Sequence, residues 1–188
     1  MNYHNITTAD MKNGDGLRVV LWVAGCAHRC DGCQNPVTWD PFDGLPFSDA
    51  ILQEEIFTEL DKDYISGITF SGGDPLHPAN RQEIARIAEI VKDRYPNKTI
   101  WMYTGYTWEE IMQYPILVAS VSQVDVLVDG RFKKDLLDVN YPWAGSTNQR
   151  VIDVQRSLNE GAVMLHECDQ ERRYAGTIRP EQNCGCCK

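Results

Sequence analysis

Three cysteines follow the first strongly apolar stretch of the chain at Cys-x3-Cys-x2-Cys spacing: Cys26, Cys30 and Cys33. Thiolates this close together in one loop can bind a single soft metal centre, and iron–sulfur clusters are the usual occupants of cysteine-only loops with such short gaps. A four-iron cluster has four corners, so three cysteines leave one iron without a protein ligand. Because that iron can coordinate a small molecule, the loop is a candidate for chemistry as well as for electron storage.

Chance and a structural zinc ion are two simpler explanations of this spacing. With 7 cysteines among 188 residues, roughly 0.01 matches are expected by chance anywhere in the chain. A structural zinc needs four ligands, and His28 cannot easily join from inside the same short loop without strain. We therefore favour a cluster over zinc and exclude chance.

A second candidate loop is Ser71-Gly72-Gly73-Asp74-Pro75. Its two glycines let the backbone approach a ligand closely, and Asp74 offers an acceptor suited to a ligand ammonium group. Taken alone, the loop is better explained as an ordinary glycine turn that ends a strand. Its predicted position, at a strand end that faces the cysteine loop, favours ligand binding instead.

Asp129 and Arg131 lie in the equivalent loop of a later strand. One could pair with a ligand hydroxyl or cation and the other with a carboxylate or a partner's backbone, but a solvated surface explains them equally well. His28, His77 and His166 have no catalytic partner visible in the sequence. We therefore predict no histidine base.

Predicted strands and helices alternate along the chain, the pattern of parallel βαβ units. Glycine and polar clusters mostly fall just after strands, on the face where such folds bind ligands. Trp39 and Phe42 are expected to anchor the loop 34–47, and Pro115 is expected to stop a short helix. Strands are predicted at 17–24, 65–70, 99–103, 124–128 and 151–154, after a polar segment 1–16; helices are predicted from the N-cap Ser48 to residue 60, over 78–95, and over 108–112 after the cap Thr107.

The composition is that of an ordinary globular protein, with 43% hydrophobic and 24% charged residues. The net charge of −9 argues against nucleic acid as a partner, because phosphate binding needs a basic surface. No run of 18 apolar residues predicts a membrane span, and residues 1–5 have no signal-peptide character. These features, with tightly clustered cysteines, predict a cytoplasmic protein that binds metal rather than forming disulfides.

The two loops together resemble the radical S-adenosylmethionine superfamily. Within it, the match is to the family of proteins that activate anaerobic ribonucleoside-triphosphate reductase, and it extends in order over residues 1 to about 150. Its departures are Gly14-Asp15-Gly16 in place of Gly-Pro-Gly, and Gln34 in place of tyrosine. The shared stretches are residues 1–4, 25–33, 71–76, 101–106, 128–130 and 145–149.

The resemblance implies an α/β fold with a parallel sheet, curved as an incomplete (βα) barrel, because about five strands cannot close an eight-stranded barrel. It also implies a [4Fe-4S] cluster whose open iron chelates S-adenosylmethionine. Reductive cleavage would then yield a 5′-deoxyadenosyl radical, which takes hydrogen from a glycine of the reductase and leaves a glycyl radical. The implied partners are the large subunit of anaerobic ribonucleotide reductase and a low-potential electron donor such as flavodoxin.

The resemblance also assigns residues to roles. Cys26, Cys30 and Cys33 would hold the cluster, and no catalytic side chain is needed beyond cluster and cofactor. Contacts with S-adenosylmethionine would come from Gly32, Cys33, Gln34, Gly72, Gly73 and Asp74, with Asp129 and Arg131 as further candidates.

Residues 1–155 are expected to form the radical S-adenosylmethionine domain, and residues 156–188 a polar tail that the family usually lacks. Cys168, Cys184, Cys186 and Cys187 could bind zinc or a second cluster, or could form a thiol-rich end without metal. Two other functions stay open: an activase of a different glycyl-radical enzyme or a small-molecule radical enzyme on the same scaffold, and a non-catalytic metal-binding interaction module.

Overall fold

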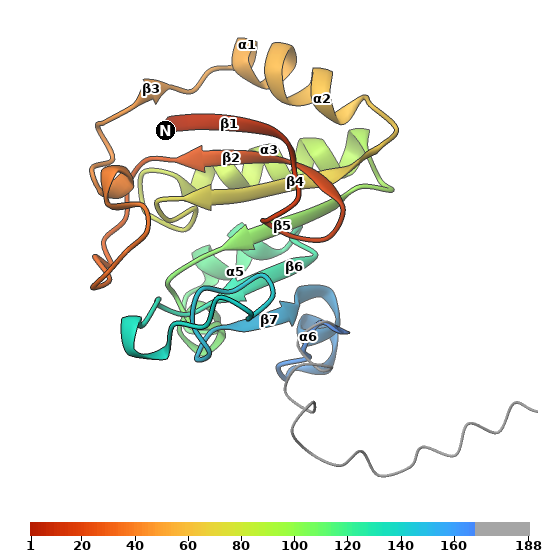
Figure 1. Ribbon diagram of the computed structural model, residues 1–188. Helices are drawn as coiled ribbons and strands as arrows, with labels where there is room; N and C mark the ends of the chain where they lie inside the picture. Colours follow the sequence, from red (N-terminus) through yellow and green to blue (C-terminus); the bar gives the residue numbers. More distant parts are fainter. Residues whose placement is uncertain (168–188) are drawn as a thin grey trace, which may run out of the picture.

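The computed structural model describes residues 1–167, which form an open seven-stranded sheet in the order β3-β1-β2-β4-β5-β6-β7 (Figure 1). The strands are β1 (Asn2–Asp10), β2 (Leu17–Val23), β3 (Leu45–Pro46), β4 (Ile65–Gly72), β5 (Thr99–Tyr103), β6 (Val126–Asp129) and β7 (Arg150–Asp153). The helices are α1 (Asp49–Ile51), the π-helical turn η2 (Leu52–Phe57), α2 (Thr58–Leu60), α3 (Arg81–Arg94), α4 (Trp108–Met112), α5 (Pro115–Val121) and α6 (Val154–Glu160), with 3-10 turns η1 (Pro36–Trp39) and η3 (Lys134–Leu136). The predicted α/β class is confirmed.

The sheet is mixed, whereas the prediction was of a parallel sheet. β2, β4, β5 and β6 run parallel, whereas β1, β3 and β7 are antiparallel to their neighbours. A parallel connection needs a crossover back to the starting edge of the sheet. The loop between β6 and β7 makes no such crossover. β7 therefore begins at the end of the sheet where β6 finishes, and it runs antiparallel to β6.

Regular structure also occurs where none was predicted, in β1, β3, α5, α6 and the 3-10 turns η1 and η3. The sequence of β1 is polar because the strand lies near the edge of the sheet. Within Asn2–Asp10, Tyr3 is the one buried residue. Pro115 does not merely end α4; it occupies the first turn of α5, where its missing N–H costs no helical hydrogen bond.

The predicted helix signals are confirmed. Ser48 caps α1 by accepting a hydrogen bond from the Ile51 N–H, and Thr107 forms a capping box with Glu110 at the start of α4. The apolar stripe of α3 is buried. The prediction for Phe42 is wrong: it is 88% exposed, and Phe47 packs instead against the Tyr3 ring at 5.9 Å.

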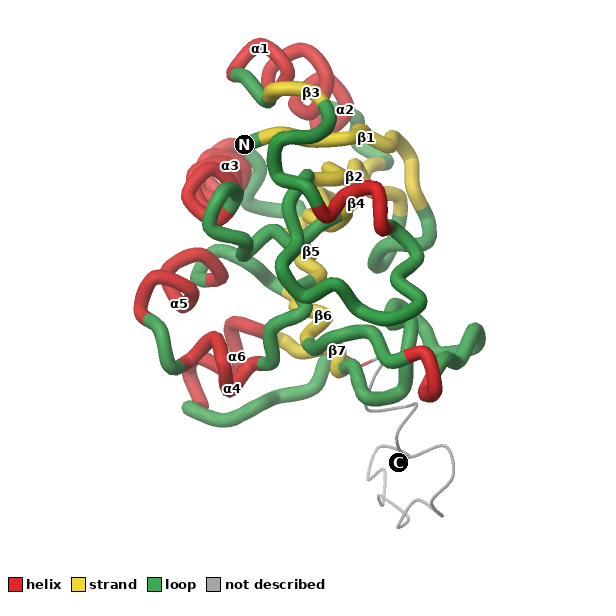
Figure 2. Tube along the Cα trace, turned by 90° about the vertical axis from the view of Figure 1, so that its left-hand side faces the viewer, coloured by secondary structure: helices red, strands yellow, loops and turns green. Residues whose placement is uncertain are grey.

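Side-chain alternation along the strands separates two faces of the sheet. Val19 and Leu21 of β2 join the main core, which packs against α3, α4 and α5, and these helices lie together on one side of the strands (Figure 2). Trp101 of β5 and Val128 of β6 point to the opposite face, where they form a smaller cluster. That face carries loops and short 3-10 turns instead of α-helices (Figure 2), and it holds the candidate site.

The folded chain continues past the predicted boundary at residue 155, which falls within α6. After α6 the chain returns to β7, where the Asp153 N–H donates to the Met164 carbonyl and the His166 N–H donates to the Val151 carbonyl, both at 2.9 Å. The metal site proposed for Cys168, Cys184, Cys186 and Cys187 lies outside the described residues. Among residues 1–167, no helix has the length and apolar character that a membrane span requires.

Candidate functional site

A cavity of about 260 Å³ opens on the helix-free face, at the carboxyl ends of the parallel strands. The thiols of Cys26, Cys30 and Cys33 all line it. Other parts of its wall are Ser71, Gly72 and Gly73 at the end of β4, Tyr103 to Gly105 at the end of β5, and Gly130 and Phe132 after β6, together with Gly145 and Gln149. The structure therefore brings the two predicted loops to one site, as expected for the carboxyl edge of parallel strands.

The cysteine loop is fixed by backbone hydrogen bonds from its first residues. The Gly25 N–H donates to the Thr38 carbonyl at 2.7 Å, and the Cys26 N–H donates to the Trp39 carbonyl at 3.0 Å. Trp39, which was predicted to anchor the loop 34–47, thus contacts the cysteine loop through its backbone carbonyl. Arg29 adopts a left-handed conformation with φ 47°, an uncommon state for a non-glycine residue that turns the chain sharply.

Backbone N–H groups point at all three sulfurs. Cys26 accepts from His28 and Arg29, Cys33 accepts from Asn35 at 3.3 Å, and Cys30 accepts from Phe132. Burial raises the pKa of the Cys26 and Cys30 thiols, so a bound metal is needed to hold them as thiolates at neutral pH.

The donor set fits a cluster better than one ion. Within residues 1–167, no three His, Cys, Asp or Glu side chains are placed to hold a single metal ion. A cubane cluster has a different requirement, because each thiolate binds its own iron and the sulfurs need not converge on one point. Three thiols that line one cavity without converging on one point meet that requirement.

Glycine is required at both positions of the Gly72-Gly73 pair. Gly72 has φ +104°, and a Cβ there would lie 2.7 Å from the Val23 backbone nitrogen. A Cβ on Gly73 would lie 2.5 Å from the Gly25 carbonyl oxygen. The two loops are therefore in direct backbone contact, and any side chain at either position would push them apart.

Asp74 has protein partners for its carboxylate. Asp74 is 1% exposed, and its carboxylate lies 2.7 Å from His28 Nε2. It also accepts hydrogen bonds from the Leu76 N–H at 2.8 Å, Thr104 Oγ1 at 2.9 Å and the Gly105 N–H at 3.0 Å. The carboxylate thus fixes His28, which lines the cavity between the first two cysteines. Direct contact between Asp74 and a ligand ammonium group stays a prediction.

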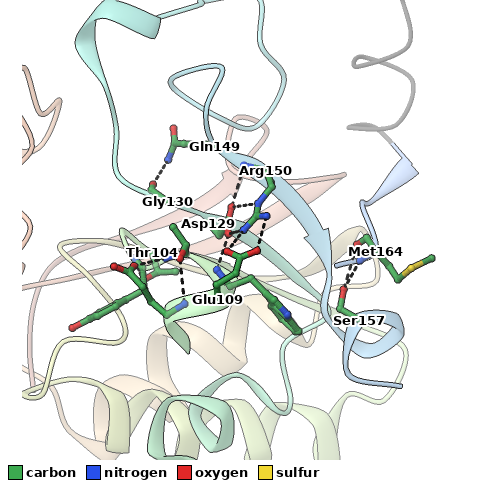
Figure 3. Close-up of polar contacts among 12 residues, drawn as sticks. Thr104, Glu109, Asp129, Gly130, Gln149, Arg150, Ser157 and Met164 are labelled. Atoms are coloured by element: carbon green, nitrogen blue, oxygen red, sulfur yellow. Dashed lines mark hydrogen bonds and ion pairs between the residues drawn. The ribbon is translucent and has the colours of Figure 1, made fainter. Parts of the chain in front are cut away.

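Asp129 and Arg131 do not join the described wall of the cavity. Asp129 is 1% exposed and accepts from the Trp108 N–H at 2.8 Å and from Arg150, which also binds Glu109 (Figure 3). Arg131 has an exposed side chain 3.9 Å from Glu110. Of the remaining predicted residues, Cys33 and Gln34 line the cavity, whereas Gly32 lies against the side chain of Lys134.

Comparison with known proteins agrees with this geometry. Residues 12–152 match the family described as "4Fe-4S single cluster domain". The anaerobic ribonucleoside-triphosphate reductase-activating protein of Enterobacteria phage T4 is 45% identical over 151 residues, covering 80% of this chain and 93% of the phage protein. The chain belongs to this family of activating proteins. Proteins of the same name from Escherichia coli K12 (42% over 153 residues, 80% of this chain and 97% of that protein) and Vibrio cholerae (39% over 151 residues, 79% and 96%) also match.

Asn80 helps to hold the two loops of the site together, and the sequence did not indicate this role. Asn80 is fully buried, and its Nδ2 donates to the carbonyls of Ala24 at 2.7 Å and Asp74 at 3.0 Å. It therefore ties the cysteine loop to the glycine loop. An asparagine before a helix is ordinarily read as an N-cap, but the Asn80 side chain makes no capping bond to α3.

Proposed function

We propose that this chain activates an anaerobic ribonucleotide reductase by reductive cleavage of S-adenosylmethionine at a [4Fe-4S] cluster. The observation that carries the proposal is one cavity lined by Cys26, Cys30, Cys33 and the Gly72-Gly73 pair. Membership of the activating-protein family and the match to a 4Fe-4S domain support it. The activity is of the oxidoreductase type.

The three cysteines would bind three irons of the cluster and leave the fourth open. One electron from the reduced cluster would cleave S-adenosylmethionine to methionine and a 5′-deoxyadenosyl radical, which takes a hydrogen atom from a reductase glycine. The chain's own contribution is to bind and orient, because the cofactor supplies the difficult chemistry. Backbone donors to every sulfur favour the thiolates that the cluster requires.

We assign the S-adenosylmethionine contacts first to Gly72 and Gly73, whose backbone lines the cavity, and to Cys33 and Gln34 on the facing wall. Gly32 would act through its backbone. Asp74 would act by holding His28 and Gly105 in place. Asp129 would hold the loop after β6, and Arg131, at the exposed end of that loop, is a candidate for contact with a partner.

The open sheet supports an incomplete barrel as the scaffold for this chemistry. The cavity lies on the face that α-helices leave free, so a glycine loop of the reductase could reach it without displacing an α-helix. A low-potential donor, such as a flavodoxin, would supply the electron. Residues 1–167 would hold the whole cluster site, with the cysteines from Cys168 onward accessory to it.

The test is anaerobic reconstitution with iron and sulfide of the full chain, of a chain ending at residue 167, and of a Cys30→Ala variant. We expect about four irons per chain in the first two, loss of the cluster in Cys30→Ala, and an electron paramagnetic resonance spectrum that shifts when S-adenosylmethionine is added. Incubation with the reductase, a reductant and S-adenosylmethionine should then give a glycyl-radical signal.

Zinc in place of iron, or a cluster whose spectrum does not change when S-adenosylmethionine is added, would contradict the proposal and favour a non-catalytic metal-binding module. A glycyl radical on a different enzyme, with none on the reductase, would contradict the assigned partner. Cys168→Ala in the full chain is the matched control, because it removes a cysteine that does not belong to the Cys-x3-Cys-x2-Cys motif and should leave the iron content unchanged.

A further inference from the structure

One hydrogen bond to the Cys30 sulfur differs from those to the other two cysteines, because its donor lies outside the cysteine loop. The donors to Cys26 and Cys33 are backbone groups of the cysteine loop itself, at His28, Arg29 and Asn35. Cys30 accepts from its own backbone N–H and also from the N–H of Phe132, a residue about a hundred positions further along the chain that lines the same cavity. This contact therefore depends on how the segment 130–133 is held against the cysteine loop.

Side chains from the loop 145–149 bind the backbone on both sides of Phe132. Gln149 Nε2 donates to the Gly130 carbonyl at 2.9 Å (Figure 3), and Asn148 Nδ2 donates to the Arg131 carbonyl at 2.9 Å. The Lys133 N–H donates to Ser146 Oγ at 3.1 Å. Three side chains of one short loop thus fix the segment that carries the Phe132 N–H.

The loop 145–149 is itself rigidly built around Gln149. The Gln149 side chain accepts through Oε1 from the N–H groups of Gly145 at 3.0 Å and Ser146 at 3.1 Å. Ser146 is fully buried, and Gln149 is 9% exposed. Gly145 leaves room for the Phe132 ring, because a Cβ there would lie 3.1 Å from the ring. Gln149 therefore links its own loop to the segment 130–133.

We propose that Gln149, assisted by Asn148 and Ser146, is a positioning residue that holds the Phe132 N–H on the Cys30 sulfur and thereby sets the reduction potential of the cluster. The inference rests on the proposed cluster site. A hydrogen bond to a cluster thiolate stabilises the extra negative charge of the reduced state, so it makes the cluster easier to reduce.

The test compares Gln149→Met with Gln155→Met. Methionine is neutral and similar in shape, so it removes the hydrogen bonds without adding charge near the cluster. Gln155 is the matched control because its Nε2 also donates to two carbonyls, those of Ser122 at 2.9 Å and Val124 at 2.7 Å, away from the described wall of the cavity. The midpoint potential is measured by a redox titration followed by paramagnetic resonance, with iron content determined in parallel.

We expect Gln149→Met to retain about four irons and to lower the equilibrium constant for reduction about tenfold, a shift of about 59 mV to more negative potential for one electron. Gln155→Met should keep the wild-type potential. A second readout needs no cluster: amide hydrogen exchange at Phe132 in the metal-free chain should become faster in Gln149→Met and stay unchanged in Gln155→Met.

An unchanged potential and unchanged Phe132 exchange in folded Gln149→Met would overturn the inference while leaving the proposed function intact. If Gln149→Met does not fold, Asn148→Ala removes the bond to the Arg131 carbonyl and the bond that Asn148 Oδ1 accepts from Ser146 Oγ at 2.9 Å, and it should shift the potential in the same direction. Equal potentials in Asn148→Ala and wild type would then overturn the inference. A wild-type chain that binds no cluster but shows the expected exchange would overturn the proposed function and the effect on potential.

Discussion

Arg150 joins two carboxylates that differ greatly in exposure. It donates to Asp129, which is 1% exposed, and in a two-pronged contact to Glu109, whose side chain is 59% exposed. The hydrogen bond from Arg150 lowers the pKa of Glu109 to about 2. At the residue scale, this pair links the start of α4 to the start of β7, beside the loop that carries Gly130.

Glu109→Gln should weaken the fold in a pH-dependent way. Because the folded-state pKa of Glu109 lies below its ordinary value of 4.5, its stabilisation is fully present above about pH 4.5 and is lost as pH falls towards 2. The free energy of unfolding of the variant should be lower at pH 7 by less than about 1 kcal/mol, since the exposed pair is screened by solvent. Urea unfolding from pH 7 to 3 should show the two proteins converging. Glu54→Gln, at an exposed glutamate, is the control, and a gap for Glu109→Gln that stays constant with pH would contradict the assignment.

At the element scale, the segment after β7 completes the edge of the sheet. The Met164 and His166 backbone groups pair with β7, and the His166 ring packs edge-on against Trp101 at 5.4 Å. Leu158 and Val163 pack against the main core. Polar residues dominate this stretch of sequence, yet its few apolar side chains and its backbone attach it to the sheet.

Removing residues 156–188 should therefore cost much more stability than removing residues 168–188. A chain that ends at residue 155 loses the packing of Leu158 and Val163 and two backbone hydrogen bonds, which together contribute about 2–4 kcal/mol. Urea denaturation compares it with the full chain and with the chain that ends at residue 167. Equal midpoints for all three would show that the core domain ends at residue 155.

At the scale of the whole molecule, a buried arginine occupies the helix-free face near the amino end of β2. Arg18 is fully buried and donates to the Ile68 and Thr99 carbonyls, each at 2.7 Å, and to the Asp15 carbonyl at 3.0 Å. Its guanidinium also lies 5.5 Å from the centre of the Trp101 ring. Burial lowers the pKa of Arg18 to about 10, so the residue stays charged at neutral pH. It joins β2, β4 and β5 at the end of the sheet opposite the cavity.

Arg18→Met should lower the free energy of unfolding by about 3 kcal/mol or more, because several buried acceptors lose their donor. The midpoint of urea unfolding measures the effect. Arg156→Met is the matched control, since Arg156 is exposed and its ion pair with Asp153 is long, at 4.0 Å. This variant should change the free energy of unfolding by no more than about 0.5 kcal/mol. A neutral Arg18→Met would mean that the cost of burying the charge cancels its hydrogen bonds.

The sequence by itself determined the local structure of the chain. The caps Ser48 and Thr107, the stripe of α3 and the buried strands are set by neighbouring residues, and all were predictable. The cysteine spacing and the Gly72-Gly73 pair were also visible, because each is a short contiguous motif at the end of a strand. The direction of β7 was not, since it depends on the path of a loop and not on the strand's own residues.

Only the tertiary structure decided which groups meet across the site. His28 with Asp74, Asn80 with the Ala24 carbonyl 56 residues away, and the Phe132 N–H with Cys30 are pairs far apart in the chain. Nothing in the neighbouring residues marks such partners, and Asn80 even occurs in a context that predicts a helix cap. Each pair forms because parallel strands place their carboxyl ends at one edge of the sheet, where loops distant in sequence must satisfy one another's buried polar groups.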